Sequence, residues 1–144
     1  MTHGPEPMGT VSRLLDATNR HDVEGIVACF STGYRNETPV HPLRGFTGNE
    51  QVRRNWTGIL AGVPDLVAEV TAAAVDGDTV WTEWRMLGTR RDGSVHEMAG
   101  VVIFALDPDR LIGSARFYLE PVERGSGDVD AAVNRQVAPA GAHR

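Results

Sequence analysis

The residues best suited to acid–base chemistry in this sequence are a glutamate and a histidine on neighbouring predicted strands. Glu83 lies between Trp81 and Arg85 on one face of its strand, where it could donate a proton inside a pocket or form a solvated pair with the arginine. His96 shares an apolar strand face with Met98, and an imidazole there could act as a general acid or base near neutral pH. A strand-end histidine that faces solvent is the alternative.

A tyrosine and an asparagine form a second candidate pair. Tyr34 and Asn36 alternate along a short predicted strand and share one of its faces with Thr38. Their hydroxyl and amide groups could line a pocket and position a substrate. We therefore take Glu83 and His96, together with this pair, as the candidate catalytic residues.

Several other chemistries are excluded by residue types. All 14 basic residues other than histidine are arginines, so no lysine can form a Schiff base. The lone Cys29 allows no internal disulfide, and its place on an apolar helix stripe predicts a buried, inert thiol in a reducing cytoplasm. The five histidines lack metal-ligand spacing, and no glycine-rich phosphate loop is present. We expect neither a metal nor a cofactor.

The bulk composition indicates one globular domain without a nucleic-acid or membrane partner. The formal net charge is -5 and no basic stripe could neutralise phosphates. No apolar run reaches membrane-spanning length, and the N-terminus lacks a signal-peptide pattern, which favours a cytoplasmic protein. The lysine-free composition, rich in Ala, Gly and Val, is typical of a GC-rich, actinobacterial genome.

The elements that must position these residues begin with helices. Apolar residues at helical spacing predict a helix over residues 9–19, and an aspartate N-cap begins a short second helix. Residues 34–38 alternate and stop at a proline, which predicts an edge strand. Thr47 and Glu50 form a capping-box pattern that opens a third helix ending near residue 60.

Four consecutive strands follow, and their turns are the strongest local signals in the sequence. Asp76-Gly77 and Asp92-Gly93 are typical of tight hairpins, and Asp107-Pro108-Asp109 makes the third turn. The strands are predicted near 66–75, 79–88, 94–106 and 111–122.

Together these elements predict an α+β fold, in which three N-terminal helices pack on a strongly curved antiparallel sheet that encloses an apolar pocket. We expect a flexible N-terminus over 1–8, a domain over 9–124 and a disordered tail over 125–144, where the composition falls to small and polar residues.

This order of elements resembles the cone-shaped, nuclear-transport-factor-2-like (NTF2-like) superfamily, and within it the SnoaL-like polyketide cyclase group. The resemblance extends over about residues 9–122. It is carried by five segments, which are 19–27 (NRHDVEGIV), 37–39 (ETP), 48–52 (GNEQV), 100–104 (GVVIF) and 116–120 (RFYLE).

The resemblance also implies where catalytic groups would lie. The three positions used by the steroid isomerase branch hold Thr38, Leu14 and Gly100, so its base, tyrosine and acid are missing. The final-strand aspartate of the aldol cyclases and of the epoxide hydrolases corresponds to Phe117. Enolising isomerisation and aldol condensation are therefore not expected.

The epoxide hydrolases of the superfamily offer a closer partial match. Their water-holding Tyr-x-Asn resembles Tyr34-Arg35-Asn36, shifted by one residue. Their Arg-x-Asp resembles Trp81-Thr82-Glu83, which would make Glu83 the proton-donating acid; with a two-residue gap, Glu83 and Arg85 take the two positions.

The expected pocket is large, apolar and sparsely polar. We predict a cofactor-independent polyketide cyclase of antibiotic biosynthesis, which closes a ring, by a [4+2]-type carbocyclisation or with acid assistance, within a linear apolar polyketide. The alternatives are epoxide hydrolysis or epoxide opening to a cyclic ether, and a non-catalytic small-molecule-binding protein. The resemblance also implies a homodimer. The predicted substrate-pocket residues are Leu14, Thr38, Trp56, Trp81, Arg85, Met98 and Phe117.

Overall fold

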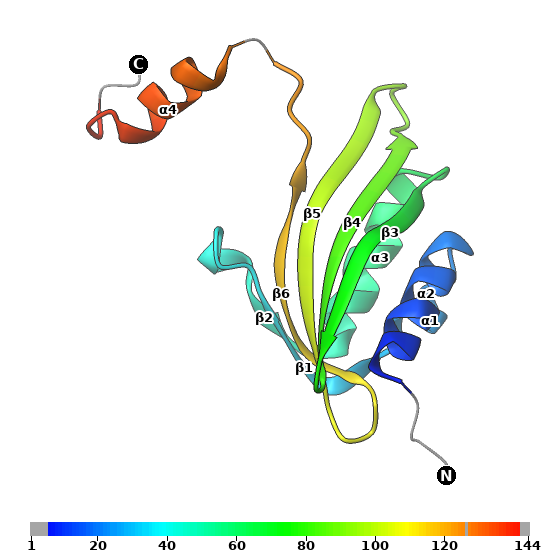
Figure 1. Cartoon of the computed structure of the whole chain (residues 1–144). Coiled ribbons are helices and arrows are strands. Elements are labelled where there is room, and N and C mark those ends of the chain that lie inside the picture. Colours follow the sequence, from blue (N-terminus) through cyan, green and yellow to red (C-terminus); the bar gives the residue numbers. More distant parts are fainter. Residues whose placement is uncertain (1–5, 126, 142–144) are drawn as a thin grey trace.

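The computed structural model describes residues 6–125 and 127–141. A six-stranded sheet with the order β2-β1-β6-β5-β4-β3 forms the centre of the fold (Figure 1). The strands are β1 (Phe30–Glu37), β2 (Phe46–Thr47), β3 (Val67–Asp76), β4 (Thr79–Thr89), β5 (Val95–Leu106) and β6 (Ile112–Pro121). The helices are α1 (Pro7–Asn19), α2 (Val23–Val27), the short 3₁₀ helix η1 (Pro42–Arg44), α3 (Asn49–Gly62) and α4 (Val129–Val137).

The α+β class and the curved sheet are confirmed, and so are the four predicted consecutive strands, β3 to β6. Gly77 and Gly93 take positive φ angles of 61° and 88° in their hairpin loops, as the Asp-Gly pairs predict. In the third turn, the Asp107 carboxylate accepts hydrogen bonds from the backbone N–H groups of Asp109 (2.9 Å) and Leu111 (3.0 Å). The turns therefore hold the strands in register.

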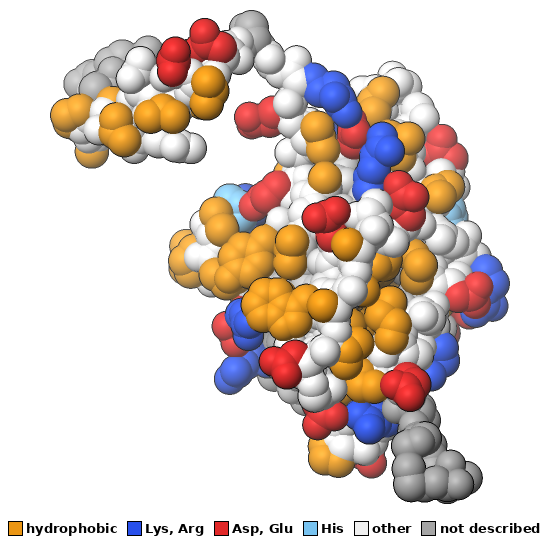
Figure 2. Space-filling view, in the orientation of Figure 1, with side chains coloured by type: hydrophobic (Ala, Val, Ile, Leu, Met, Phe, Trp, Pro, Cys, Tyr) orange, Lys and Arg blue, Asp and Glu red, His pale blue; other side chains and the backbone are white. Residues whose placement is uncertain are grey.

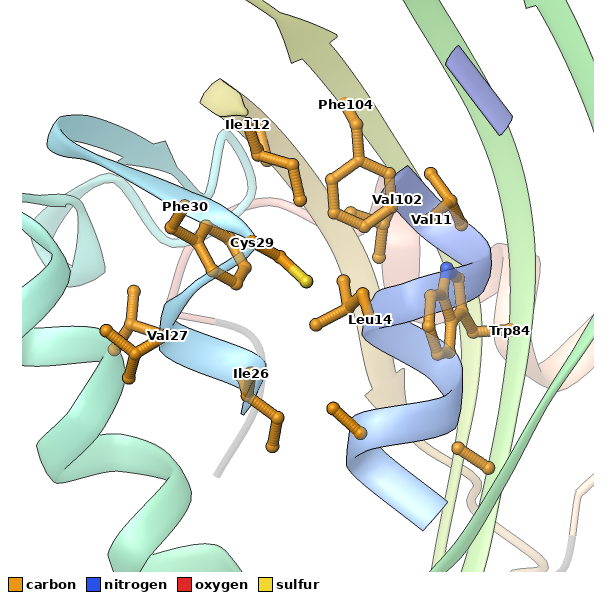
Figure 3. Packing of buried hydrophobic residues seen from close by; sticks show 14 of the residues in the cluster. Val11, Leu14, Ile26, Val27, Cys29, Phe30, Trp84, Val102, Phe104 and Ile112 are labelled. Carbon is orange, nitrogen blue, oxygen red and sulfur yellow. The ribbon is translucent and has the colours of Figure 1, made fainter. Parts of the chain in front are cut away.

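The core lies between the helices and the inner face of the sheet (Figure 3). Leu14 of α1 projects into this cluster, to which Trp84 of β4 and Phe104 of β5 also belong, and all three side chains are buried. Cys29 is buried in the same cluster, and burial raises the pKa of its thiol above the ordinary value. The thiol is therefore protonated and unreactive at neutral pH, as its place on an apolar stripe predicts.

β1 differs from the predicted edge strand. It is longer than expected, it lies between β2 and β6, and it runs parallel to β6, with Asn36 opposite Ala115 and Glu37 opposite Arg116. The proline after Thr38 ends the strand but does not leave it at the edge, because two residues of β2 pair with its outer side. The prediction of an edge strand is wrong, since a partner far along the chain cannot be inferred from local alternation.

The start of α3 also differs from the prediction. Thr47 belongs to β2, and Gly48, with a φ of 98°, occupies the N-cap without any side-chain cap. Glu50 bonds to Arg53 instead of reaching back to the helix start. The capping box is therefore absent, and a glycine in a conformation that other residues rarely adopt starts the helix.

The segment expected to be a disordered tail contains helix α4. The Asp128 carboxylate accepts a hydrogen bond from the Ala131 N–H at 3.0 Å and caps the helix. Val129, Val133 and Val137 recur every four residues and are exposed, and α4 lies away from the sheet (Figure 1). The prediction of a disordered tail is wrong for these residues. It rested on the overall composition of small and polar residues and overlooked the regular valine spacing and the Asp128 N-cap. At the other end, α1 begins at Pro7, inside the segment expected to be flexible, and residues 1–5 lie outside the described residues.

Gly100 allows β5 and β6 to approach each other closely. Its φ is 149°, and a Cβ atom added there would lie 2.1 Å from the Tyr118 carbonyl oxygen and 2.8 Å from Leu119 Cα. These neighbours are backbone atoms, so they cannot move aside as a flexible side chain would. A glycine at this position is therefore required by the local geometry.

We expect Gly100→Ala to lower the free energy of unfolding by about 2 kcal/mol or more, because the new methyl group must displace the β6 backbone. Urea denaturation followed by circular dichroism would measure the change. Gly58→Ala on α3 is the matched control, since an added Cβ meets nothing within 4 Å there, and a helical alanine should leave stability unchanged or raise it by up to about 1 kcal/mol. Equal stability of both variants would contradict the prediction.

Candidate functional site

A pocket of about 400 Å³ lies between α3, β1 and the inner faces of β4, β5 and β6. Most of its wall is apolar, with polar groups contributed by β1, the following loop, α3 and β5. Neither aspartate nor glutamate lines it. Its lining residues are Phe30, Tyr34, Asn36, Thr38, Arg44, Phe46, Val52, Asn55, Trp56, Ile59, Met86, His96, Met98, Phe117 and Leu119.

Tyr34 and Asn36 form one hydrogen-bonded unit on β1. The Tyr34 hydroxyl donates to Asn36 Oδ1 at 2.7 Å, so alternation along the strand places both side chains on the pocket side. Phe30 and Phe46 pack edge-on against the Tyr34 ring, with centroid distances of 4.7 and 5.9 Å. Burial raises the pKa of Tyr34 above its ordinary value. The phenol is therefore a fixed hydrogen-bond donor at neutral pH rather than a base.

His96 reaches the pocket from β5 and is half-buried. Burial, and then the positive charge of Arg90, lower the pKa of His96 below its ordinary value. The ring is neutral at pH 7, with one nitrogen able to donate and the other able to accept. No hydrogen bond to this ring occurs within residues 6–125 and 127–141, so both nitrogens can meet a ligand.

The deep end of the pocket borders a small void of about 30 Å³ that Leu14, Trp84 and Phe117 line with other apolar residues. The indole N–H of Trp84 donates to Thr82 Oγ1 at 2.7 Å, and the Thr82 hydroxyl donates to the Val102 carbonyl at 2.6 Å. These polar atoms are satisfied within the protein, so the deep wall presents an apolar surface to a ligand.

Glu83 lies on the opposite face of the sheet from the pocket. Along β4, Thr82 and Trp84 are buried while Glu83 is exposed, and its carboxylate accepts a hydrogen bond from the Thr71 hydroxyl at 2.8 Å. The expectation that Glu83 is a pocket acid is therefore wrong. Side chains alternate between the two faces of a strand, and the inner face of β4 takes the even-numbered residues.

Trp81 and Arg85 share the outer face with Glu83, so their expected place in the pocket is also wrong. Trp81 is 45% exposed. The Arg85 guanidinium lies 3.9 Å from the Glu69 carboxylate and 3.5 Å from the Glu97 carboxylate. Of the predicted pocket residues, Thr38, Trp56, Met98 and Phe117 line the main pocket, and Leu14 lines the deep void.

The sequence argument missed most of the contribution of α3. Val52, Asn55, Trp56 and Ile59 all line the pocket, and only Trp56 was singled out from the sequence. Their spacing of three, four and seven residues is that of one helix face. That periodicity could have identified Asn55, the one polar group of this stripe. Arg44 was missed because it lies in the short η1 segment, where no periodic pattern exists.

A family model described as a SnoaL-like domain matches residues 11–113. The chain belongs to the SnoaL-like family. No curated protein sequence matches the chain.

Within the described residues of this SnoaL-like protein, no helix is long and apolar enough to cross a membrane. The same residues contain no group of three or more His, Cys, Asp or Glu side chains that could hold a metal ion.

Solved structures share this SnoaL-like fold at low sequence identity. The epoxide hydrolase/cyclase-like enzyme SalBIII, described in pyran ring formation in the polyether salinomycin, superposes with a TM-score of 0.68 at 20% identity, over 81% of this chain and 90% of that chain. RV0760c from Mycobacterium tuberculosis, in complex with estradiol-17beta-hemisuccinate, gives 0.69 at 17% identity, over 88% and 98%. A SnoaL-like protein of unknown function from Burkholderia thailandensis gives 0.63 at 24%, over 81% and 94%.

We expect the imidazole of His96 to titrate below its ordinary pKa of 6.5 in an NMR pH titration, because burial and Arg90 both disfavour the charged ring. Arg90→Gln should raise the pKa part of the way, since burial remains. Between the lowered pKa and 6.5 the unfolded chain binds more protons at this site, so His96 makes the free energy of unfolding fall as pH decreases through that window.

Arg20→Gln is the matched control for this titration, because Arg20 lies at the end of α1 and lines neither the pocket nor its surroundings. A His96 pKa that does not change in Arg90→Gln, or that changes equally in Arg20→Gln, would contradict the assignment of Arg90 as the neighbouring charge.

Proposed function

We propose that this SnoaL-like protein is a cofactor-independent cyclase of secondary metabolism that closes a ring within a linear, apolar polyketide. The observation that carries the proposal is the composition of the pocket. Most of the lining is apolar, and the polar groups, from β1, the following loop, α3 and β5, are neutral donors and acceptors apart from Arg44. Such a pocket favours a folded apolar ligand held by a few oriented hydrogen bonds.

Holding the substrate in a reactive fold would supply most of the rate enhancement. Trp56, Met86, Met98 and Phe117 line the space from α3, β4, β5 and β6, so their side chains would confine the apolar part of a ligand. Orientation of two reacting groups in one molecule can contribute about 7–11 kcal/mol to lowering a barrier in favourable cases. A [4+2] carbocyclisation uses this effect fully because it requires no proton transfer.

The polar groups would then stabilise charge that develops on a substrate carbonyl. The Asn36 amide group, whose oxygen accepts from the Tyr34 hydroxyl, and the neutral His96 ring can each donate a hydrogen bond to such an oxygen. No carboxylate lines the pocket, so no Asp or Glu side chain is present there to act as the base that removes a proton in an aldol condensation. These features favour carbocyclisation over the aldol chemistry associated with the wider family.

Epoxide opening, to a diol or a cyclic ether, is the second candidate function. It is favoured by the Tyr34–Asn36 unit, which could hold an attacking oxygen, and by the fold shared with SalBIII. The reaction needs an acid for the epoxide oxygen, and with Glu83 on the outer face that acid would be His96. The lowered pKa of His96 disfavours the protonated ring at neutral pH. Epoxide opening is therefore less well supported than ring closure by confinement of the substrate.

The test is the rate of ring closure of the linear polyketide that accumulates when the gene is deleted from its host, measured with purified protein by liquid chromatography and mass spectrometry. We expect wild type and Glu83→Gln to accelerate closure equally, and Phe117→Ala to lose about 10²-fold through lost orientation. His96→Gln should lose less than about 10-fold; a loss of 10² or more would mean acid assistance. No acceleration by wild type would contradict the proposal and favour a binding protein.

We further propose that the cyclase is a cytoplasmic homodimer that pairs through the outer face of the sheet. Hydrophobic side chains lie exposed among charged ones over the strands (Figure 2), and Trp81 and Tyr118 are 45% and 38% exposed. Covering both rings would remove a large apolar area from water.

Trp81→Arg should convert the dimer to a monomer in size-exclusion chromatography with light scattering, because a desolvated charge would face the partner. Val137→Arg on α4 replaces an exposed residue far from that face and should leave the dimer intact. A monomeric wild type would contradict the proposal.

A further inference from the structure

A groove of about 480 Å³ lies beside the pocket, between the C-terminal half of α3 and the β4–β5 hairpin. Asn55, Ile59 and His96 line both spaces, so the groove and the pocket meet at these three side chains. A ligand longer than the pocket could therefore extend into the groove past His96.

The groove carries positive charge without acidic side chains. Arg54 and Arg90 line it, and neither aspartate nor glutamate does, although the whole chain has a net charge of -5. Arg54 donates to the side-chain oxygen of Gln51, and Arg90 donates to Ser94 Oγ (3.3 Å) and to the Val95 carbonyl. All these acceptors are neutral, so neither guanidinium is neutralised by an ion pair.

The neighbouring arginine on α3 is ion-paired, unlike Arg54. Arg53, next to Arg54 on α3, contacts the carboxylates of Glu24 and Glu50. α3 therefore presents a paired arginine on one side and, on the groove side, an arginine whose guanidinium has no carboxylate within 4 Å in the described part of the chain.

The charge of Arg90 reaches both sides of the hairpin. Burial and then Arg90 lower the pKa of His96, and the hydrogen bonds from Ser94 and then Arg90 lower the pKa of Asp92 at the hairpin tip. Asp92 is held by hydrogen bonds to the backbone N–H (3.0 Å) and the hydroxyl (2.6 Å) of Ser94, and it does not line the groove. The permanently charged side chains that line the groove are therefore the two arginines.

We infer that the groove binds the carboxylate of an elongated ligand whose apolar body fills the pocket, with Arg54 and Arg90 as its partners. The inference deepens the proposed function and rests on it for the pocket being a ligand site; it narrows the substrate class to linear apolar acids. α3 ends at Gly62, which also lines the groove, and its carbonyl end carries partial negative charge that opposes a phosphate dianion more strongly than a single carboxylate. Arg91 already donates to one such carbonyl, that of Ala61, at 2.7 Å.

Parinaric acid, a linear tetraenoic acid whose fluorescence rises in apolar surroundings, and its methyl ester are the probes. Titration of the wild-type protein should show that the acid binds about 10-fold more tightly than the ester, the size of one charge-assisted hydrogen bond. The double variant Arg54→Gln/Arg90→Gln should lose this preference and still bind the ester, which shows that its pocket is intact. Arg20→Gln, the matched control, should keep the preference.

Equal binding of acid and ester by wild type, or a preference that survives in the double variant, would overturn the inference. If the double variant fails to bind the ester, a salt titration of the wild-type protein is the test instead. Raising the salt concentration from about 0.01 to 1 M should abolish the preference for the acid, because screening weakens exposed charge pairs. A salt-independent preference would overturn the inference.

The outcome is separable from that of the proposed function. Preferential binding of the acid by a protein that does not accelerate ring closure would leave the carboxylate groove standing and make the protein a carrier of apolar acids. Ring closure of the linear polyketide without any preference for the acid would keep the cyclase and remove the groove from its substrate recognition.

Discussion

The close approach of the paired strands β5 and β6 at Gly100, within the curved sheet, is the constraint on which the pocket depends. Within the described residues, Gly100 is the only residue inside a strand with a positive φ, and its missing side chain lets the β6 backbone approach β5. A flat sheet would present its inner face as a plane, whereas a bent sheet curves around α3 and leaves a space between them. The glycine stabilises no contact of its own. Its contribution is to permit the curvature that encloses the pocket.

The same sheet shows how far sequence reasoning extends. Strand lengths and turns could be predicted because Asp-Gly pairs and alternating apolar residues act locally. Much of the site could be predicted where the inward side of an element was evident, as for Tyr34 and Asn36 on β1 and for His96 and Met98 on β5. On β4 the prediction depended on which face of the strand points inward. The family pattern placed Glu83 and Trp81 on the inner face. The structure buries Thr82, Trp84 and Met86 there, so Glu83 and Trp81 lie on the outer face. The parallel partner of β1 could not be predicted at all, because pairing between distant strands leaves no local signal.

The pocket combines two kinds of electrostatic surroundings. At its deep end every polar atom is bonded within the protein, so a ligand meets a surface without charge or free dipoles. Toward the groove, His96 lines both spaces, with the neutral Tyr34–Asn36 unit in the pocket and, in the groove, two arginines that have no carboxylate within 4 Å among the described residues. A molecule with one apolar end and one anionic end would therefore have a defined direction in the site, and direction is what a reaction controlled by substrate folding needs most.

The parallel pairing of β1 with β6 has a consequence for biosynthesis. Strand β1 is among the first elements to leave the ribosome, but its central partner is the last strand of the sheet. Until β6 is complete, β5 has an unpaired edge and the apolar inner face has no closed boundary. Such a high contact order predicts slow folding that finishes after translation, with an aggregation-prone interval in between. Variants that slow the docking of β6 would therefore reduce the yield of protein in cells more than they reduce its stability once folded.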